Sequence, residues 1–176
     1  EELKELLNEI IPVIDRVSSD KNFGRPSFFE VVTMLALMYF SRRNADPVIL
    51  EVGLGGRLDA TNIIKKPLLS VITSISREYT DILGDTLEEI AYDKAGIIKK
   101  GCPVITGVSD DRALNVIKQK AEKMGSKFIN IDNEYKYEIV KTNLEEQEFK
   151  FTRDQKSEKL IINLLAEYQV RNALIA

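Results

Sequence analysis

The sequence contains no histidine, no tryptophan and a single cysteine, Cys102. A lone cysteine cannot build a disulfide framework, so the sequence favours a reducing compartment, and we expect a cytoplasmic protein. Because no histidine can activate it, Cys102 is also a poor candidate for a catalytic nucleophile. These absences exclude disulfide scaffolds and thiol–histidine chemistry.

Long hydrophobic runs and an excess of positive charge are also missing. The longest apolar run, residues 31–40, is far shorter than the roughly 20 residues of a membrane-spanning helix, and no signal peptide is apparent. A formal net charge of −3 gives no reason to expect nucleic acid as a partner. We therefore expect neither a membrane nor a nucleic-acid partner. Both ends of the sequence fall inside helical patterns, so we expect a piece of a longer protein.

The two common nucleotide-binding fingerprints are absent. No G-x-x-x-x-G-K-[ST] loop occurs anywhere in the sequence. Gly53 and Gly55 begin a G-x-G-x-x-G pattern, but Leu58 occupies the position of its third glycine. Simple glycine spacing therefore predicts no phosphate-binding loop.

The composition is that of a soluble globular protein, with 176 residues, 44% of them hydrophobic and 30% charged. Short β-branched segments alternate with helical patterns, which predicts an α/β fold with a mostly parallel, doubly wound sheet and helices on both faces. Residues 134–163 instead alternate apolar and polar side chains, and this pattern predicts antiparallel hairpins on the edge of the sheet. We expect one domain over residues 1–176.

The predicted elements follow from periodicity, caps and breakers. Residues 27–43 are apolar almost all round and are expected to form a buried helix that Ser27 caps with Glu30. Asp85 or Thr86 is expected to cap the helix over 87–99. The expected helices are 1–17, 27–43, 87–99, 110–125 and one beginning at 166, and the expected strands are 47–52, 68–75, 103–108 and 126–131.

One predicted strand end carries unusual polar content. The segment VILEVGLGGRLDATN, residues 48–62, passes from an apolar run to Glu51, three glycines and a polar cluster. A carboxylate at this position must be hydrated, paired or bound to a cation. Magnesium would suit one or two carboxylates together with phosphate and water. The alternative is that Glu51 pairs with Arg57 or caps the following turn.

The segment LEVGLGGRLDATNII, residues 50–64, resembles the signature of the folylpolyglutamate synthase and dihydrofolate synthase family of the Mur-ligase superfamily. The segment SFFEVVTMLALMYF at 27–40 resembles the family's Thr-Tyr-Phe-Glu helix. YTDILGDTLEEIAYDKAGIIKKGCPVITG at 79–107 follows in the family's order, and LLAEYQVRNALIA at 164–176 resembles its Gly-x-His-Gln-x-x-Asn-Ala segment. The resemblance covers nearly the whole sequence, as part of the central ATPase domain.

The resemblance implies an ATP-dependent, ADP-forming ligase. In such enzymes the γ-phosphate of ATP passes to a substrate carboxylate, and the amino group of glutamate then attacks the acyl phosphate. The implied cofactors are ATP and Mg²⁺, and the implied partners are folate or dihydropteroate and L-glutamate. A monomeric full-length protein is also implied. Whether it adds the first glutamate, later ones, or both stays open.

Site residues follow from the resemblance, position by position. Glu51 matches the magnesium-binding glutamate, and Lys94 matches a lysine that is carbamylated in relatives and serves catalysis. Asn172 matches an asparagine that approaches the adenine of ATP. The residues that fall on the pterin-contacting segments are Ser27, Phe28, Phe29, Glu30, Leu58, Asp59 and Ala60.

The sequence departs from the family at two histidines. Tyr79 stands where relatives have a metal-ligating histidine, and Tyr168 stands at the later one. The family's phosphate-binding loop would lie upstream of residue 1 and its C-terminal domain beyond residue 176, so we expect the chain alone not to catalyse ligation. Two hypotheses result: a ligase that contains this chain, which we prefer, and a non-catalytic relative that keeps a nucleotide or pterin pocket.

Overall fold

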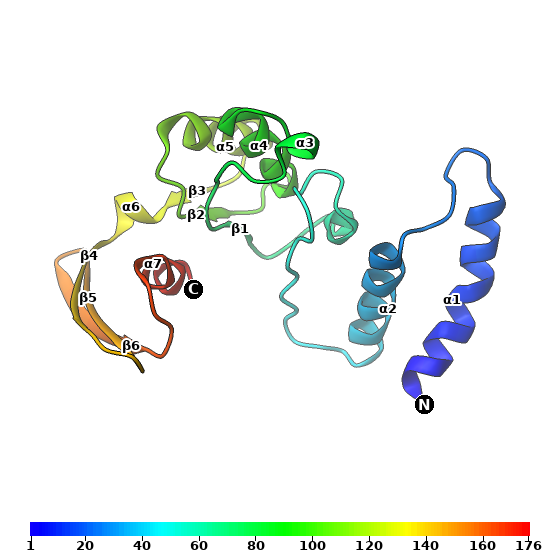
Figure 1. The fold of residues 1–176 in the computed structure, drawn as a ribbon, viewed down its shortest axis with the longest axis horizontal. Helices are drawn as coiled ribbons and strands as arrows, with labels where there is room; N and C mark the ends of the chain where they lie inside the picture. The colour runs from blue at the N-terminus through cyan, green and yellow to red at the C-terminus, as the bar shows by residue number, and fades with distance from the viewer. The chain divides into compact units, whose positions relative to one another are not determined.

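The computed structural model describes residues 1–176, and the chain divides into two compact units. Residues 1–54 and 59–63 form the N-terminal unit, and residues 55–58 and 64–176 form the C-terminal unit. Figure 1 shows the elements of both. The division separates the apolar side chains into distinct cores, and each unit is described by itself.

The N-terminal unit is a pair of helices, α1 (Glu2–Ser19) and α2 (Phe28–Arg42), as the periodicity predicted. Leu6 and Ile10 lie one turn apart on α1, so they share a face and pack with Leu35 of α2. Exposed ion pairs, Arg42 with Glu9 and Arg43 with Glu2, also join the helices. The capping box of Ser27 and Glu30 starts α2 as expected.

The prediction that α2 is buried on all sides is wrong. Only Thr33 and Leu35 of this helix are buried, whereas Phe28 is 84% exposed. The reason is that α1 is the only other long helix of this unit, and one helix covers one face.

The predicted strand over residues 47–52 is also absent. The segment has no regular secondary structure, and Ile49 is 95% exposed. β-branched residues favour extended backbone, but a strand exists only where a neighbour completes its hydrogen bonds. No segment of residues 1–176 pairs with this one.

The C-terminal unit contains a parallel sheet with the order β1 (Ser70–Ile72), β2 (Val104–Thr106) and β3 (Phe128–Asn130). The expected strands at 68–75, 103–108 and 126–131 are therefore confirmed, although each is shorter. α4 (Leu87–Lys94) connects β1 to β2, and α5 (Asp111–Met124) connects β2 to β3. Both helices lie on the same side of the sheet (Figure 1), where Ala91 and Ile117 pack with Ile72 and Val104.

The opposite face of the parallel sheet carries α7 (Glu167–Ile175). Its buried Val170 and Leu174 belong to a second core that Ile105 of β2 joins from the sheet. Since Ile105 alternates with Val104 and Thr106 along the strand, it points to the other side. Helices on both faces are therefore confirmed. The remaining short elements are α3 (Thr80–Leu83), α6 (Ile131–Glu134), and the 3₁₀ turns η1 (Ala60–Ile63) and η2 (Ala95–Ile97).

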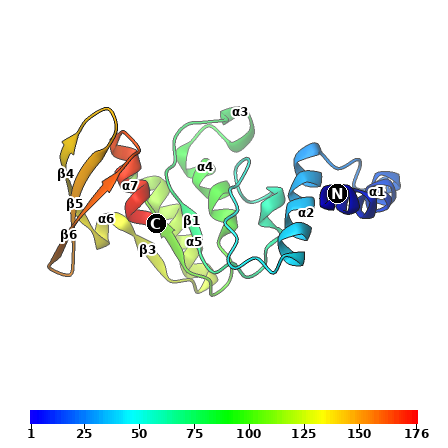
Figure 2. The ribbon, with the colours of Figure 1, turned by 90° about the horizontal axis from the view of Figure 1, so that it is seen from below.

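The antiparallel hairpins predicted for residues 134–163 are present as β4 (Lys136–Thr142), β5 (Gln147–Arg153) and β6 (Lys156–Ile162). They form a sheet of their own rather than an edge of the parallel sheet, because α6 follows β3 directly and the chain leaves that sheet before β4 begins. Phe149 of β5 is fully buried with Val170 of α7, and Figure 2 shows α7 beside these strands. The predicted α/β class is confirmed.

No helix of the structure combines the length and the hydrophobicity that crossing a bilayer requires.

Ile117→Ala should lower the free energy of unfolding by about 2–5 kcal/mol, because the side chain is fully buried between α5 and the sheet and its removal leaves a cavity. Urea unfolding measures this loss. The matched change Ile82→Ala, at a side chain that is 66% exposed in α3, should cost no more than about 0.5 kcal/mol. Equal costs at the two positions would contradict the assignment of the core.

Candidate functional site

A single carboxylate closes the glycine-containing loop that follows Glu51. Asp59 Oδ2 accepts hydrogen bonds from the backbone N–H groups of Gly53 and Leu54, both at 3.0 Å. Its Oδ1 accepts from the backbone N–H of Thr61 at 2.9 Å and from the Thr61 hydroxyl at 2.6 Å. The four bonds fix the loop locally within the N-terminal unit. Asp59, a predicted pterin contact, thus has a structural task in the loop.

These hydrogen bonds also decide the charge of Asp59. Partial burial by itself would raise the pKa of this carboxyl, but hydrogen bonds from Thr61, Leu54 and Gly53 outweigh burial and lower the pKa below its usual value. Asp59 therefore stays ionised and keeps accepting all four bonds at neutral pH.

Phe29 reaches the same loop from α2. A Cβ atom built on Gly53 would lie only 2.7 Å from Cζ of the Phe29 ring. The missing side chain thus lets the aromatic ring lie directly on the loop backbone. Phe28 is 84% exposed. Of the two predicted pterin-contacting phenylalanines, one packs on the loop and the other is uncovered.

Ser27 and Glu30 bond to each other at the start of α2. The Ser27 backbone N–H and hydroxyl both donate to Glu30 Oε2 at 2.7 Å, and the Glu30 N–H donates to the Ser27 hydroxyl at 3.3 Å. The backbone and hydroxyl bonds from Ser27 lower the pKa of Glu30. Their position in the capping box is confirmed, and their contact with substrate stays a prediction.

Glu51 is exposed and makes no hydrogen bond or ion pair in the structure. Arg57, its expected alternative partner, pairs with Asp93 at 3.2 Å instead, and Asp59 supplies the turn-closing bonds. The carboxylate of Glu51 is thus open to solvent and able to accept a cation. Because magnesium commonly takes one or two carboxylates with water and phosphate oxygens, this donor fits the ion.

No group of three or more histidine, cysteine, aspartate or glutamate side chains comes together to hold a metal ion. The described residues therefore do not form an all-protein metal cage. A site built on one or two carboxylates would take its remaining ligands from water and phosphate.

Lys94 and Tyr79 both lie in the C-terminal unit, at the ends of helices. Lys94 is the last residue of α4, is half-buried, and makes no ion pair. Tyr79 precedes α3 in a left-handed conformation, with φ of 53°, and its side chain is 63% exposed. The phenol is thus free to reach solvent, although a neutral phenol is a weaker metal ligand than imidazole.

Asn172 lies on α7, where its Nδ2 donates to Gln169 Oε1 at 3.1 Å. The neighbouring Arg171 was not predicted as a site residue. Its guanidinium donates to both carboxylate oxygens of Asp132 at 2.8 and 2.9 Å and to the Gly107 carbonyl at 2.6 Å. The Asp132 bonds raise the pKa of Arg171, and the charge is permanent. Arg171 therefore anchors the helix that carries Asn172 to the end of β2.

The predicted residues divide between the units. The N-terminal unit holds Glu51, Asp59, the pterin-side residues of α2, and Ala60, which begins η1. The C-terminal unit holds Lys94, Tyr79, Asn172 and Leu58, which is 79% exposed. The ion pair of Arg57 with Asp93 was missed, although Asp93 directly precedes Lys94 in the sequence.

Asp59→Asn should lower the free energy of unfolding at neutral pH by about 2 kcal/mol, because an amide turns an acceptor into a donor against backbone N–H groups. The native pKa is lowered, so the stabilisation is complete above the unfolded pKa of about 3.9 and is lost as pH falls through the native pKa. Unfolding at several pH values between about 6 and 3 should show the free energies of unfolding of Asp59→Asn and the unmodified protein becoming equal at low pH. Asp46→Asn, at an exposed carboxylate of the same unit, is the control. A pH-independent difference for Asp59→Asn would contradict the role of its charge.

Comparison with known proteins places these features in one family. Residues 6–176 match the Mur ligase middle domain, a region that includes both units. The chain is 37% identical over 181 residues to the dihydrofolate synthase/folylpolyglutamate synthase of Bacillus subtilis, covering 100% of the chain and 41% of that protein. It is 46% identical over 112 residues to the Haemophilus influenzae protein of the same name, covering 64% of the chain and 25% of that protein.

Solved structures of folylpolyglutamate synthases share the fold of this chain. The folylpolyglutamate synthase of Thermotoga maritima has a TM-score of 0.86 at 35% identity, over 99% of this chain and 39% of that one. An FPGS–AMPPCP–folate complex has a TM-score of 0.86 at 31% identity, over 98% of this chain and 42% of that one. The chain therefore spans less than half the length of these relatives. By sequence and by fold, it belongs to the Mur ligase middle domain family and, within that family, to the folylpolyglutamate and dihydrofolate synthases.

Proposed function

We propose that the protein containing this chain is an ATP-dependent ligase that adds glutamate to dihydropteroate or to folate and forms ADP. The observation that carries the proposal is the exposed carboxylate of Glu51, which has no protein partner and adjoins a loop that Asp59 holds closed. The relatives are named as enzymes of this activity, and related structures hold AMPPCP and folate. A cytoplasmic, monomeric protein stays our prediction.

In the proposed reaction a substrate carboxylate oxygen attacks the γ-phosphorus of ATP, and the bond to the β–γ bridging oxygen breaks to release ADP. The glutamate amine nitrogen then attacks the acyl carbon and gives up a proton to water, the amide bond forms, and phosphate leaves with the acyl oxygen. Mg²⁺, when bound, would neutralise charge on the phosphates. Glu51 would hold that ion, and Asn172 would approach the adenine ring. The residues' main contribution is positioning.

Lys94 is proposed to carry a carbamate. The neutral amine nitrogen would attack the carbon of CO₂, an N–C bond would form, and the nitrogen would lose a proton to water. The product is an anion where the unmodified side chain is a cation. A half-buried lysine with no ion-pair partner suits this change, because no carboxylate has to be displaced.

The pterin ring is proposed to contact the segment that begins α2 and the segment around Asp59. Phe29 already lies against Gly53 of the loop, and Phe28 and Leu58 are large apolar side chains that are mostly exposed. An apolar side chain that is open to solvent is able to contact the face of a planar ring. Ser27, Glu30 and Ala60 complete the proposed segments.

A non-catalytic relative is the second candidate. Tyr79 and Tyr168 replace two family histidines, and both tyrosines are exposed, at 63% and 62%. Such a protein would bind a nucleotide or pterin without forming ADP. Turnover by the full-length protein therefore separates the two candidates. That the chain alone does not turn over also stays a prediction.

Glu51→Gln in the full-length protein should reduce Mg²⁺-dependent ADP formation by at least about a hundredfold, because a neutral amide does not replace the carboxylate toward a cation. The assay contains ATP, Mg²⁺, glutamate, and either dihydropteroate or folate. The thermal midpoint should not change, because Glu51 makes no protein contact that the substitution removes.

Glu5→Gln, at an exposed position of α1, removes the same charge from the same unit and should keep full activity. If Glu51→Gln retained near-normal turnover, the proposed role of Glu51 would be wrong. If the unmodified protein bound ATP but released no ADP, the non-catalytic alternative would replace the ligase.

Tyr79→His should lower the Mg²⁺ concentration needed for half-maximal activity by about tenfold, equivalent to about 1.4 kcal/mol. Imidazole offers a nitrogen lone pair at neutral pH, and histidine tolerates the left-handed backbone of this position better than most residues. Magnesium titration of the full-length enzyme measures the shift. Tyr92→His, at a 60% exposed position of α4, is the control. An unchanged magnesium requirement in Tyr79→His would argue against metal binding at this position.

A further inference from the structure

The loop at residues 55–58 is bonded to the end of the helix that carries Lys94. The backbone N–H of Arg57 donates to the carbonyl of Asp93 at 2.9 Å. The last carbonyls of a helix have no partner within the helix, so this bond satisfies one of them from outside. The loop therefore acts as a cap for the last turn of α4.

An ion pair reinforces the same junction. Arg57 Nε donates to Asp93 Oδ2 at 3.2 Å, and the Arg57 backbone N–H also approaches Asp93 Oδ1 at 3.3 Å. The Asp93 side chain is only 16% exposed, whereas that of Arg57 is 47% exposed. Because Asp93 is largely shielded from water, the pair is screened less than one on the open surface. A cation at this helix end also opposes the negative end of the helix dipole.

Three glycines allow this contact. A Cβ atom on Gly55 would lie 2.3 Å from Asp93 Oδ1, and one on Gly56 would lie 2.9 Å from the Lys94 carbonyl oxygen. A Cβ on Gly96 would lie 2.4 Å from Cα of Arg57. Residues 55–57 therefore pack directly against residues 93–96. No additional side chain fits between these two stretches of the chain.

We propose that Arg57 and Asp93 are positioning residues for Lys94. Their ion pair and backbone bond hold the loop on the last turn of α4 and so fix the backbone from which the Lys94 side chain extends. This inference rests on the proposed function, in which Lys94 carries the carbamate. It assigns a role to two residues that the sequence did not predict as site residues.

The test uses the full-length protein with ¹³C-bicarbonate and Mg²⁺ and observes the carbamate carbon by NMR. Lys94→Ala removes the signal and so assigns it. Asp93→Asn keeps the shape of the side chain and the backbone carbonyl but removes the charge. The carbamate signal should fall by about tenfold, and kcat should fall by a similar factor, since a displacement near 1 Å costs this much or more. KM for ATP should stay within a factor of about two.

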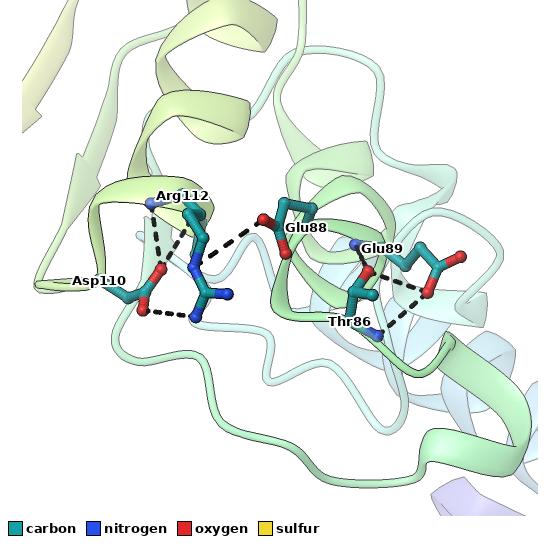
Figure 3. A network of polar contacts seen from close by, with 6 residues as sticks. Thr86, Glu88, Glu89, Asp110 and Arg112 are labelled. Carbon is teal, nitrogen blue, oxygen red and sulfur yellow. Dashed lines mark hydrogen bonds and ion pairs between the residues drawn. The ribbon is translucent and has the colours of Figure 1, made fainter.

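Arg112→Ala is the matched control. Arg112 forms an ion pair with Glu88 at 3.9 Å and another with Asp110 at 3.2 Å, and Figure 3 shows it next to both carboxylates. The Glu88 pair ties the opposite end of α4 to the start of α5. This variant removes an arginine from the same helix pair but leaves the end that carries Lys94 intact. Its carbamate signal and kcat should match those of the unmodified protein.

The outcomes separate the inference from the function on which it rests. A full carbamate signal and full kcat in folded Asp93→Asn overturn the positioning role, while the carbamate on Lys94 stands. No signal in the unmodified protein, with full turnover in Lys94→Ala, overturns the proposed role of Lys94 itself. If Asp93→Asn fails to fold, Arg57→Gln replaces it, because glutamine keeps much of the side chain but removes the charge of the ion pair. An unchanged signal in that variant likewise overturns the proposal.

Discussion

The close packing of residues 55–58 on the end of α4 is the constraint on which the candidate site depends. Where Gly56 meets the Lys94 carbonyl and Gly96 meets Arg57, the two stretches of backbone approach so closely that no Cβ fits. Arg57 then supplies a backbone donor and a charge to Asp93 at the helix end. The segment that carries the incomplete G-x-G-x-x-G pattern thus needs Gly55 and Gly56 for close contact with Asp93 and Lys94. Its polar residues can then be assigned individual tasks.

Asp59 and Asp93 do comparable work in different units. Asp59 accepts hydrogen bonds from the N–H groups of Gly53 and Leu54 and from the Thr61 hydroxyl within the N-terminal unit. Asp93 receives Arg57 within the C-terminal unit. Both carboxylates stabilise the loop, whereas Glu51 has no protein partner. This distribution explains how the segment at residues 48–62, which contains two acids, presents only Glu51 to a cation.

Side-chain hydrogen bonds also hold helices of the C-terminal unit in place. Thr86 and Glu89 cap the start of α4 (Figure 3), Asp110 caps α5, and Arg171 fixes α7 to the Gly107 carbonyl at the end of β2. The proposed ligand-binding residues Lys94 and Asn172 therefore lie on helices whose ends or neighbouring residues are bonded to the rest of the unit. Such restraint suits a reaction in which the protein mainly positions phosphate and carboxylate groups.

The sequence alone determined the features that arise from local chemistry. Apolar periodicity and caps located α1, α2 and α5 to within a few residues, and β-branched runs located three parallel strands. The motif at residues 50–64 indicated the family, and the match over residues 6–176 confirms it. These signals are readable because propensity, capping and motif spacing act between residues close in the sequence.

Only the tertiary structure decided which side chains find partners. Residues 47–52 read as a strand but have no neighbour to pair with, α2 is mostly exposed, and residues 136–162 form their own sheet. The sequence allowed Arg57 to pair with Glu51, six residues away, yet it pairs with Asp93, 36 residues away. Pairing, burial and close glycine contacts depend on distant segments meeting, and no local pattern encodes which segments meet.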